Sequence, residues 1–179
     1  MGERALRRAV FLDRDGVINR PLVRGGKPYP PLRLEEFEIY PDAQESCARL
    51  KAAGLALVVI TNQPEVGRGV QSREVVEAMH ATMCAALPID RVEVCYDSGD
   101  VEFYKPATGM LRRAAAELAL DLEVGFLVGD RWRDIDCGHA AGCVTIWIDR
   151  GYDEPLRQAP DFRTDSLGGA VEIILRVCG

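Results

Sequence analysis

Two aspartates stand one residue apart directly after an apolar run, in the stretch VFLDRDGVIN at residues 10–19. Alternate residues of an extended backbone point the same way, so Asp13 and Asp15 would place two carboxylates side by side. Such like charges repel unless a cation lies beside them or one carboxyl group holds a proton. The pair is therefore costly for a purely structural element, and it suits a site where one carboxylate attacks and the other moves a proton.

Length and composition are those of one ordinary globular domain. The chain has 179 residues, of which 47% are hydrophobic and 28% are charged, and its formal net charge is −6. We therefore expect a single domain over residues 1–179 that behaves as a monomer. The acidic balance argues against broad nucleic-acid binding. No apolar run approaches the ~20 residues that cross a bilayer, so a membrane partner is not expected either.

The N-terminal residues and the cysteines both favour a cytoplasmic location. Residues 1–8 lack the apolar stretch and the cleavage site of a secretory signal. Myristoylation at Gly2 would require Ser or Thr where Leu6 stands. No two cysteines form a C-x-x-C pair, so we predict reduced thiols rather than a disulfide framework. The six cysteines are Cys47, Cys84, Cys95, Cys137, Cys143 and Cys178.

Runs typical of strands alternate with runs typical of helices. The predicted strands are residues 10–12, 55–60, 91–96, 125–128 and 144–148. The predicted helices are residues 42–53, capped by Asp42 with Glu45 at the capping-box position, residues 72–87, capped by Ser72, residues 108–120, a helix from about Asp134, and residues 166–177. This alternation predicts a Rossmann-like three-layer α/β fold, with a mostly parallel sheet and helices on both faces. Residues 20–33, rich in Gly and Pro, are the one irregular stretch.

Polar residues follow four of the predicted strands, at the sheet edge where ligands of open α/β sheets bind. Asp13 and Asp15 follow the first, Thr61, Asn62 and Gln63 the second, Lys105 the third, and Asp130, Arg131 and Asp134 the fourth. Each of these groups alone is common in turns or at helix caps. Four such groups, one after each of four strands, are poorly explained by coincidence. Carboxylates that hold Mg²⁺, together with Lys and Thr that bind phosphoryl oxygens, suit a metal-assisted phosphate reaction.

In this order the four regions resemble the signature motifs of the haloacid dehalogenase-like (HAD) phosphohydrolases. The matching stretches are FLDRDGV, VVITNQ, YKPATGM and VGDRWRDI, within residues 11–135. The chain resembles most the D-glycero-D-manno-heptose 1,7-bisphosphate phosphatases, with the histidinol phosphatases as close relatives. The resemblance implies the HAD fold and a Mg²⁺-dependent phosphomonoesterase that forms an aspartyl-phosphate. The implied substrate is heptose 1,7-bisphosphate, with histidinol phosphate or another small sugar phosphate as the alternative. The spacing between motifs leaves no room for a separate cap domain.

The resemblance also implies a role for each motif residue. Asp13 would be the nucleophile and a metal ligand, and Asp15 the general acid and then base, its backbone carbonyl touching the metal. Thr61 and Lys105 would bind the transferring phosphoryl group. Asp130 would be a metal ligand, and Asp134 would orient the cluster. The predicted substrate contacts are Arg14, Asn19, Asn62, Gln63, Tyr104 and Arg131, with residues 20–33 as a wall that sets specificity.

The expected zinc loop of this subgroup is missing. The subgroup usually carries Cys-x-His and then Cys-x-Cys ahead of Arg-Lys-Pro, whereas this chain reads VCYDSGDVEFYKP. Asp97 stands where His is expected, and Tyr104 replaces the Arg. Because Cys95 alone cannot hold a tetrahedral zinc ion, we expect no zinc. Gly99 and Asp100 are then the expected turn residues and Phe103 the packing anchor.

Two histidines and a rival class of protein complete the sequence-based interpretation. His80 and His139 have no ligand partner at suitable spacing, so we interpret both as structural. A receiver domain also uses a phosphorylatable Asp, Mg²⁺, Thr and Lys on a parallel sheet. It has no need of an acid two residues after its nucleophile, so Asp15 discriminates against this class. The complete set of acids likewise argues against an inactive scaffold.

Overall fold

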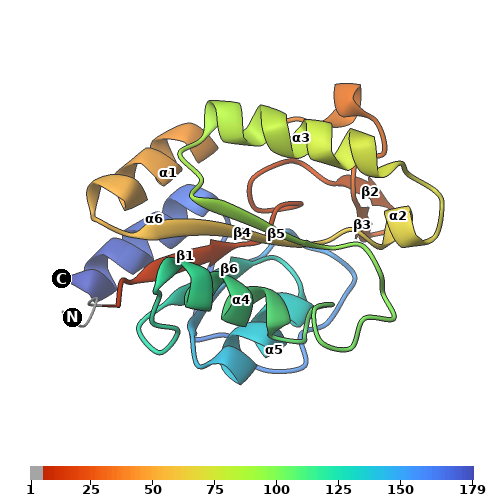
Figure 1. The fold of residues 1–179 in the computed structure, drawn as a ribbon. Coiled ribbons are helices and arrows are strands. Elements are labelled where there is room, and N and C mark those ends of the chain that lie inside the picture. Colours follow the sequence, from red (N-terminus) through yellow and green to blue (C-terminus); the bar gives the residue numbers. More distant parts are fainter. Residues whose placement is uncertain (1–5) are drawn as a thin grey trace.

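A six-stranded parallel sheet in the order β5-β4-β1-β6-β7-β8 forms the centre of the molecule (Figure 1). The structure is a computed structural model and describes residues 6–179. β1 lies between β4 and β6, and all its residues are buried, as in strands covered on both faces. The strand bounds are Ala9–Leu12 (β1), Ala56–Asn62 (β4), Arg91–Cys95 (β5), Phe126–Gly129 (β6), Val144–Ile148 (β7) and Phe162–Thr164 (β8).

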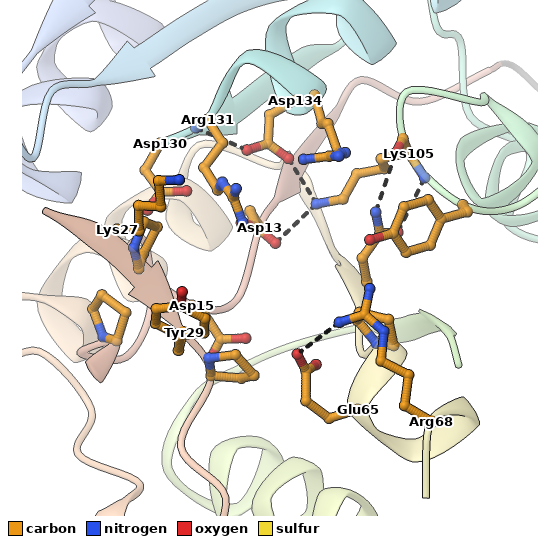
Figure 2. A pocket seen from close by; sticks show the side chains of 17 residues that line it. Asp13, Asp15, Lys27, Tyr29, Glu65, Arg68, Lys105, Asp130, Arg131 and Asp134 are labelled. Carbon is orange, nitrogen blue, oxygen red and sulfur yellow. Dashed lines mark hydrogen bonds and ion pairs between the residues drawn. The ribbon is translucent and has the colours of Figure 1, made fainter. Parts of the chain in front are cut away.

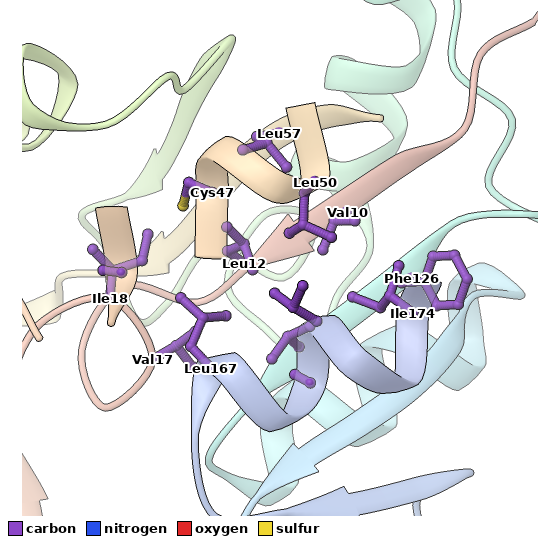
Figure 3. Close-up of a cluster of buried hydrophobic side chains, with 14 of the residues drawn as sticks. Val10, Leu12, Val17, Ile18, Cys47, Leu50, Leu57, Phe126, Leu167 and Ile174 are labelled. Carbon is purple, nitrogen blue, oxygen red and sulfur yellow. The ribbon is translucent and has the colours of Figure 1, made fainter. Parts of the chain in front are cut away.

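Helices cover both faces of the sheet, and each face has its own core. Val10 and Leu12 of β1 pack with the helices α1 and α6 (Figure 3) and with Met83 of α3, while the intervening Phe11 packs with α4 and α5 on the other face. This alternation follows from the period of two of an extended chain. The helix bounds are Ala43–Ala52 (α1), Pro64–Gly67 (α2), Arg73–Ala86 (α3), Gly109–Leu118 (α4), Trp132–Ala141 (α5) and Leu167–Cys178 (α6), with a 3₁₀ turn at Leu34–Glu36 (η1).

The predicted three-layer α/β fold is confirmed, and most elements agree within two residues. The main difference at the site is the length of β4, which continues through Thr61 and Asn62 instead of ending before them. The sequence analysis also missed β8, η1 and the short helix α2. β8 is an edge strand of three residues, too short to show an alternating pattern.

Residues 20–33 are not irregular throughout, contrary to expectation. β2 (Leu22–Arg24) pairs antiparallel with β3 (Lys27–Tyr29) to form a hairpin. Its turn residues Gly25 and Gly26 have φ angles of +56° and +74°, which glycine adopts without strain and which match the twist of a two-residue hairpin. The stretch that follows the two acids is therefore an ordered flap.

The start of α1 also differs from the prediction. Asp42 precedes the helix but makes no capping hydrogen bond, because its backbone already has helical angles. Its Oδ2 instead accepts a hydrogen bond of 3.0 Å from the backbone N–H of Gly168, at the start of α6. The predicted capping box with Glu45 is therefore wrong, whereas Ser72 caps α3 through Val75 as predicted.

The described residues include no helix that is long and apolar enough to cross a membrane. All six cysteines are free thiols. Residues 1–5, which entered the expectation of a cytoplasmic location, lie outside the described part of the chain.

Candidate active site

A cavity of about 250 Å³ opens where β1, β4 and β6 end (Figure 2). Asp13, Asn62 and Asp130 line it at these strand ends. Lys27 and Tyr29 of the flap hairpin form one wall, and Glu65 and Arg68 at α2 form another. The four predicted motif regions therefore meet at one edge of the sheet, as the parallel topology requires.

Lys105 joins two of the acids at the base of this cavity. Its Nζ donates hydrogen bonds of 2.8 Å to Asp13 Oδ1, 2.7 Å to Asp134 Oδ1 and 3.0 Å to the carbonyl of Ile60. The Asn62 amide binds the lysine backbone on both sides, accepting from its N–H at 3.0 Å and donating to its carbonyl at 3.2 Å. The end of β4 thus positions the lysine of the next motif.

The acids and the lysine shift one another's protonation equilibria. Burial, together with the charge of Asp134, raises the pKa of Asp13 to about 6 against the opposing effect of Lys105. Burial and the charges of Asp13 and Asp134 also raise the pKa of Asp130 well above its ordinary value. Although burial lowers it, the carboxylates of Asp13 and Asp134 raise the pKa of Lys105 overall. The cluster therefore carries more negative charge than its own cation balances.

The same cluster fits a divalent cation. One carboxylate oxygen from each of Asp13, Asp130 and Asp134 lies within 4.8 Å of the others. Both Asp130 oxygens are buried with no hydrogen-bond partner in the described structure. If all three carboxyl groups are ionised, one ammonium group balances only one of their three charges, and burial together with this imbalance raises the pKa values of Asp13 and Asp130. A divalent cation that prefers hard oxygen ligands, such as Mg²⁺, would relieve this imbalance. Asp134, predicted as a supporting residue, belongs to this group of carboxylates, and its two oxygens also accept from Lys105 Nζ and from the Arg131 N–H.

The close approach of Asp130 depends on Gly16. A Cβ atom at this position would lie 1.7 Å from Asp130 Oδ2, and the φ angle of Gly16 is +86°. Only glycine fits both the left-handed backbone and the space. The glycine that follows the two acids in the first motif thus makes room for the acid of the fourth.

The Asp15 carboxylate is held by residues that the sequence analysis assigned to substrate. Arg14 Nη2 donates to both of its oxygens at 3.0 and 3.1 Å, Asn19 Nδ2 donates to Oδ1 at 2.9 Å, and Gln63 Nε2 donates to Oδ2 at 2.7 Å. All three donor residues are fully buried, and none lines the cavity. The expectation that Arg14, Asn19 and Gln63 contact substrate is therefore corrected, because they lie behind Asp15 and fix its orientation.

Gln63 also orients the hydroxyl of Thr61. Its Nε2 donates a hydrogen bond of 2.8 Å to Thr61 Oγ1. Because the hydroxyl accepts this bond, its own proton is free to donate elsewhere. Thr61 is itself buried and is not among the residues that line the cavity, so its contact with a phosphoryl oxygen stays a prediction.

The remaining predicted substrate residues Asn62, Tyr104 and Arg131 do line the cavity. Arg131 is already paired, because its Nε and Nη2 lie 2.8 and 2.6 Å from Glu154 Oε2. The sequence analysis missed Glu154, which follows the last predicted strand, and it missed Lys27 as an individual residue. Lys27 could have been found from its position: it directly follows Gly25 and Gly26, in the segment that comes after Asp13 and Asp15.

Turns hold the loop that replaces the zinc loop. Asp97 Oδ1 accepts from the Gly99 N–H at 2.8 Å, and Asp100 Oδ1 accepts from the N–H groups of Glu102 and Phe103 at 3.0 Å. The Phe103 ring packs against the α4–α5 core. These contacts agree with the turn residues and the anchor predicted for this loop.

Replacing Cys95 by serine is expected to leave phosphatase activity within about twofold of the parent. The Cys95 thiol donates only to the Asp97 carbonyl, at 3.2 Å, and serine retains that donor. Phosphate release and elemental analysis of the purified protein check this expectation. About one zinc per chain, lost together with activity in the variant, would show a zinc site at this loop.

Comparison with known proteins places the chain and its fold in one class. The chain belongs to the HAD-like hydrolases, and residues 103–170 match the HAD-hydrolase-like family. More particularly, it is 32% identical over 193 residues to D-glycero-D-manno-heptose-1,7-bisphosphate 7-phosphatase from Thermosynechococcus vestitus, an alignment that covers 94% of this chain and 95% of the relative. The resemblance seen in the motifs is thereby confirmed, and the receiver-domain alternative is set aside.

Solved structures show the same fold. D,D-heptose 1,7-bisphosphate phosphatase from Burkholderia thailandensis is 26% identical and superposes with a TM-score of 0.64, covering 94% of this chain and 99% of that one. The enzyme from B. bronchiseptica, complexed with magnesium and phosphate, has a TM-score of 0.79 at 24% identity, covering 95% of this chain and 99% of that one.

Proposed function

We propose that this phosphatase removes one phosphate from D-glycero-D-manno-heptose 1,7-bisphosphate through an aspartyl-phosphate on Asp13. The observation that carries the proposal is the position of Asp13 at the cavity floor, bound to Lys105 and next to two further buried acids. The named relative, which is similar over almost the whole chain, supports the substrate.

In the proposed reaction, an Asp13 oxygen attacks phosphorus while the bond to the sugar oxygen breaks, and Asp15 gives that oxygen a proton. Water then attacks the phosphorus of the aspartyl-phosphate, Asp15 takes its proton, and inorganic phosphate leaves. Lys105 and Thr61 bind the phosphoryl oxygens during both steps. Asp13, Asp130 and the backbone carbonyl of Asp15 would hold Mg²⁺, with Asp134 beside them, and the ion would supply charge compensation when bound.

Basic side chains around the cavity support an anionic sugar with a second phosphate. Lys27, Arg68, Arg131 and Arg133 line it, although the chain as a whole is acidic. Acids line the cavity as well, and Glu65 and Glu154 pair with three of these arginines, so the support is local: each basic group can contact a phosphoryl oxygen although the chain is acidic. Among residues 6–179, Lys27 makes no ion pair, so its charge is available to substrate.

A substrate screen for phosphate release tests this proposal. Both anomers of heptose 1,7-bisphosphate, histidinol phosphate and p-nitrophenyl phosphate are compared at equal concentration with Mg²⁺ and with excess chelator. We expect a heptose bisphosphate to have the highest kcat/KM and chelation to abolish release. A tenfold preference for histidinol phosphate would favour the alternative substrate, and full activity in chelator would contradict the metal assignment. A monomeric, cytoplasmic enzyme of one domain remains our prediction.

A further inference from the structure

Arg14 is a fully buried cation whose contacts extend away from the cavity. Its Nη2 binds Asp15, while Nη1 lies 3.2 Å from Nε2 of His80 and 3.9 Å from the sulfur of Met79. Its guanidinium carbon lies 5.4 Å from the centre of the Phe37 ring. The guanidinium group therefore has a reactive-site carboxylate on one side and an α3 histidine on the other.

The chemistry of the contact defines the state of His80. A guanidinium group only donates, so Nε2 of His80 must accept, and the ring proton lies on Nδ1. Nδ1 faces Glu77 Oε2 at 4.0 Å. Burial and the charge of Arg14 lower the pKa of His80 to about 4, so the imidazole is neutral near neutral pH. The neutral ring offers its lone pair to the buried arginine.

We propose that His80 is a positioning residue for Asp15 and acts through Arg14. The inference rests on the proposed function, in which Asp15 moves the proton. The guanidinium fork is planar, so the acceptor on Nη1 also sets the direction in which Nη2 presents its N–H groups to Asp15. His80 was interpreted as structural from the sequence, and its contact with Arg14 gives it this second role.

Arg14 Nε is already buried without a partner in the described structure, and Nη1 otherwise has only the Met79 sulfur at 3.9 Å. Loss of the histidine acceptor therefore leaves a second N–H group without a strong acceptor, which favours rotation of the guanidinium group toward another partner. Asn19 and Gln63 still bind Asp15, so its orientation is loosened rather than lost. The expected effect is therefore a fraction of the effect of removing Asp15 itself. It falls on the step that needs a proton, the departure of a poor leaving group.

His80→Leu and His80→Gln, assayed on two substrates, test the proposal. Heptose 1,7-bisphosphate has a leaving group that needs a proton, whereas the leaving group of p-nitrophenyl phosphate does not. We expect His80→Leu to lower kcat on the sugar phosphate ~10-fold and on the aryl phosphate less than ~3-fold. His80→Gln, whose side-chain oxygen can accept from Arg14, should restore sugar-phosphate turnover to within ~3-fold of the parent.

Met83→Ala is the matched control. Met83 is fully buried one turn further along α3 and packs in the core, so its truncation loosens the helix without removing the Arg14 acceptor. Both substrates should then lose activity equally. In an Asp15→Asn background, His80→Leu should cause no further loss on the sugar phosphate, because the two residues act on one function.

Equal losses on both substrates in His80→Leu, with a folded protein, would overturn the proposal. If His80→Leu does not fold, His80→Gln and His80→Asn decide, because asparagine is too short to place its oxygen at the position of Nε2. The proposal would also be overturned if the ratio of kcat on the sugar phosphate to kcat on the aryl phosphate were the same in His80→Gln and His80→Asn. A parent protein that releases phosphate from neither substrate contradicts the proposed function itself, whereas an active parent with unchanged ratios contradicts only the role of His80.

Discussion

Asp13→Asn is expected to lower phosphate release at least ~10³-fold on every substrate, because the amide keeps the shape of the carboxylate but cannot attack phosphorus. The fold should persist, since Lys105 keeps its second carboxylate partner, Asp134, at 2.7 Å. Steady-state turnover and a thermal unfolding curve for the same preparation check both parts. The change also removes a negative charge from a buried, crowded cluster, so the melting temperature measured in excess chelator is not expected to fall.

Asp136→Asn is the matched control for this variant. Asp136 lies on α5, like Asp134, but its carboxylate binds Gln158 and does not line the cavity. Its replacement should leave turnover within about twofold of the parent, as surface substitutions usually do. An Asp13→Asn protein that retains turnover within tenfold of the parent would remove Asp13 as the nucleophile.

Asp15→Asn is expected to slow turnover of sugar phosphates by ~10²–10⁴, the usual contribution of general acid–base catalysis. The asparagine oxygen can still accept from Arg14, but the amide cannot give or take the proton. Aryl phosphates with activated leaving groups should lose less, because their departure needs no proton. The ratio of kcat on heptose 1,7-bisphosphate to kcat on p-nitrophenyl phosphate measures this difference. Equal losses on both would show that Asp15 only positions other groups.

The location of the site could be predicted from the sequence because the ends of buried strands can be recognised where an apolar run stops. Asp13 and Asp130 directly follow apolar strands, a loop leads from β5 to Lys105, and a parallel sheet brings the carboxyl ends of its strands together. The resemblance then supplied their roles. The pattern of apolar and polar residues does not predict where side chains point beyond a strand end. After β1 the chain turns at Gly16, and the alternation of side chains between the two faces stops there.

This explains the residues that were misplaced. Arg14, Asn19 and Gln63 belong to the motifs, and nothing in their order tells whether they face substrate or support Asp15 from behind. The flap hairpin has strands of three residues, too short for a period to be recognised. Asp42 looked like a helix cap, but its partner is the Gly168 N–H, 126 positions away in the chain. Such contacts depend on tertiary packing and carry no local signal.

The acids of the cavity lower the stability of the fold, although the proposed activity requires them. Replacing Asp13 or Asp130 with a neutral side chain relieves electrostatic repulsion in the native state, so selection for a robust fold alone would remove these two acids. A cation that binds the folded chain and not the unfolded one reverses this bias by mass action. The ionic composition of its surroundings thus helps determine how much of this protein is folded, and an enzyme kept in abundant divalent salt can tolerate mutations elsewhere that the bare chain cannot.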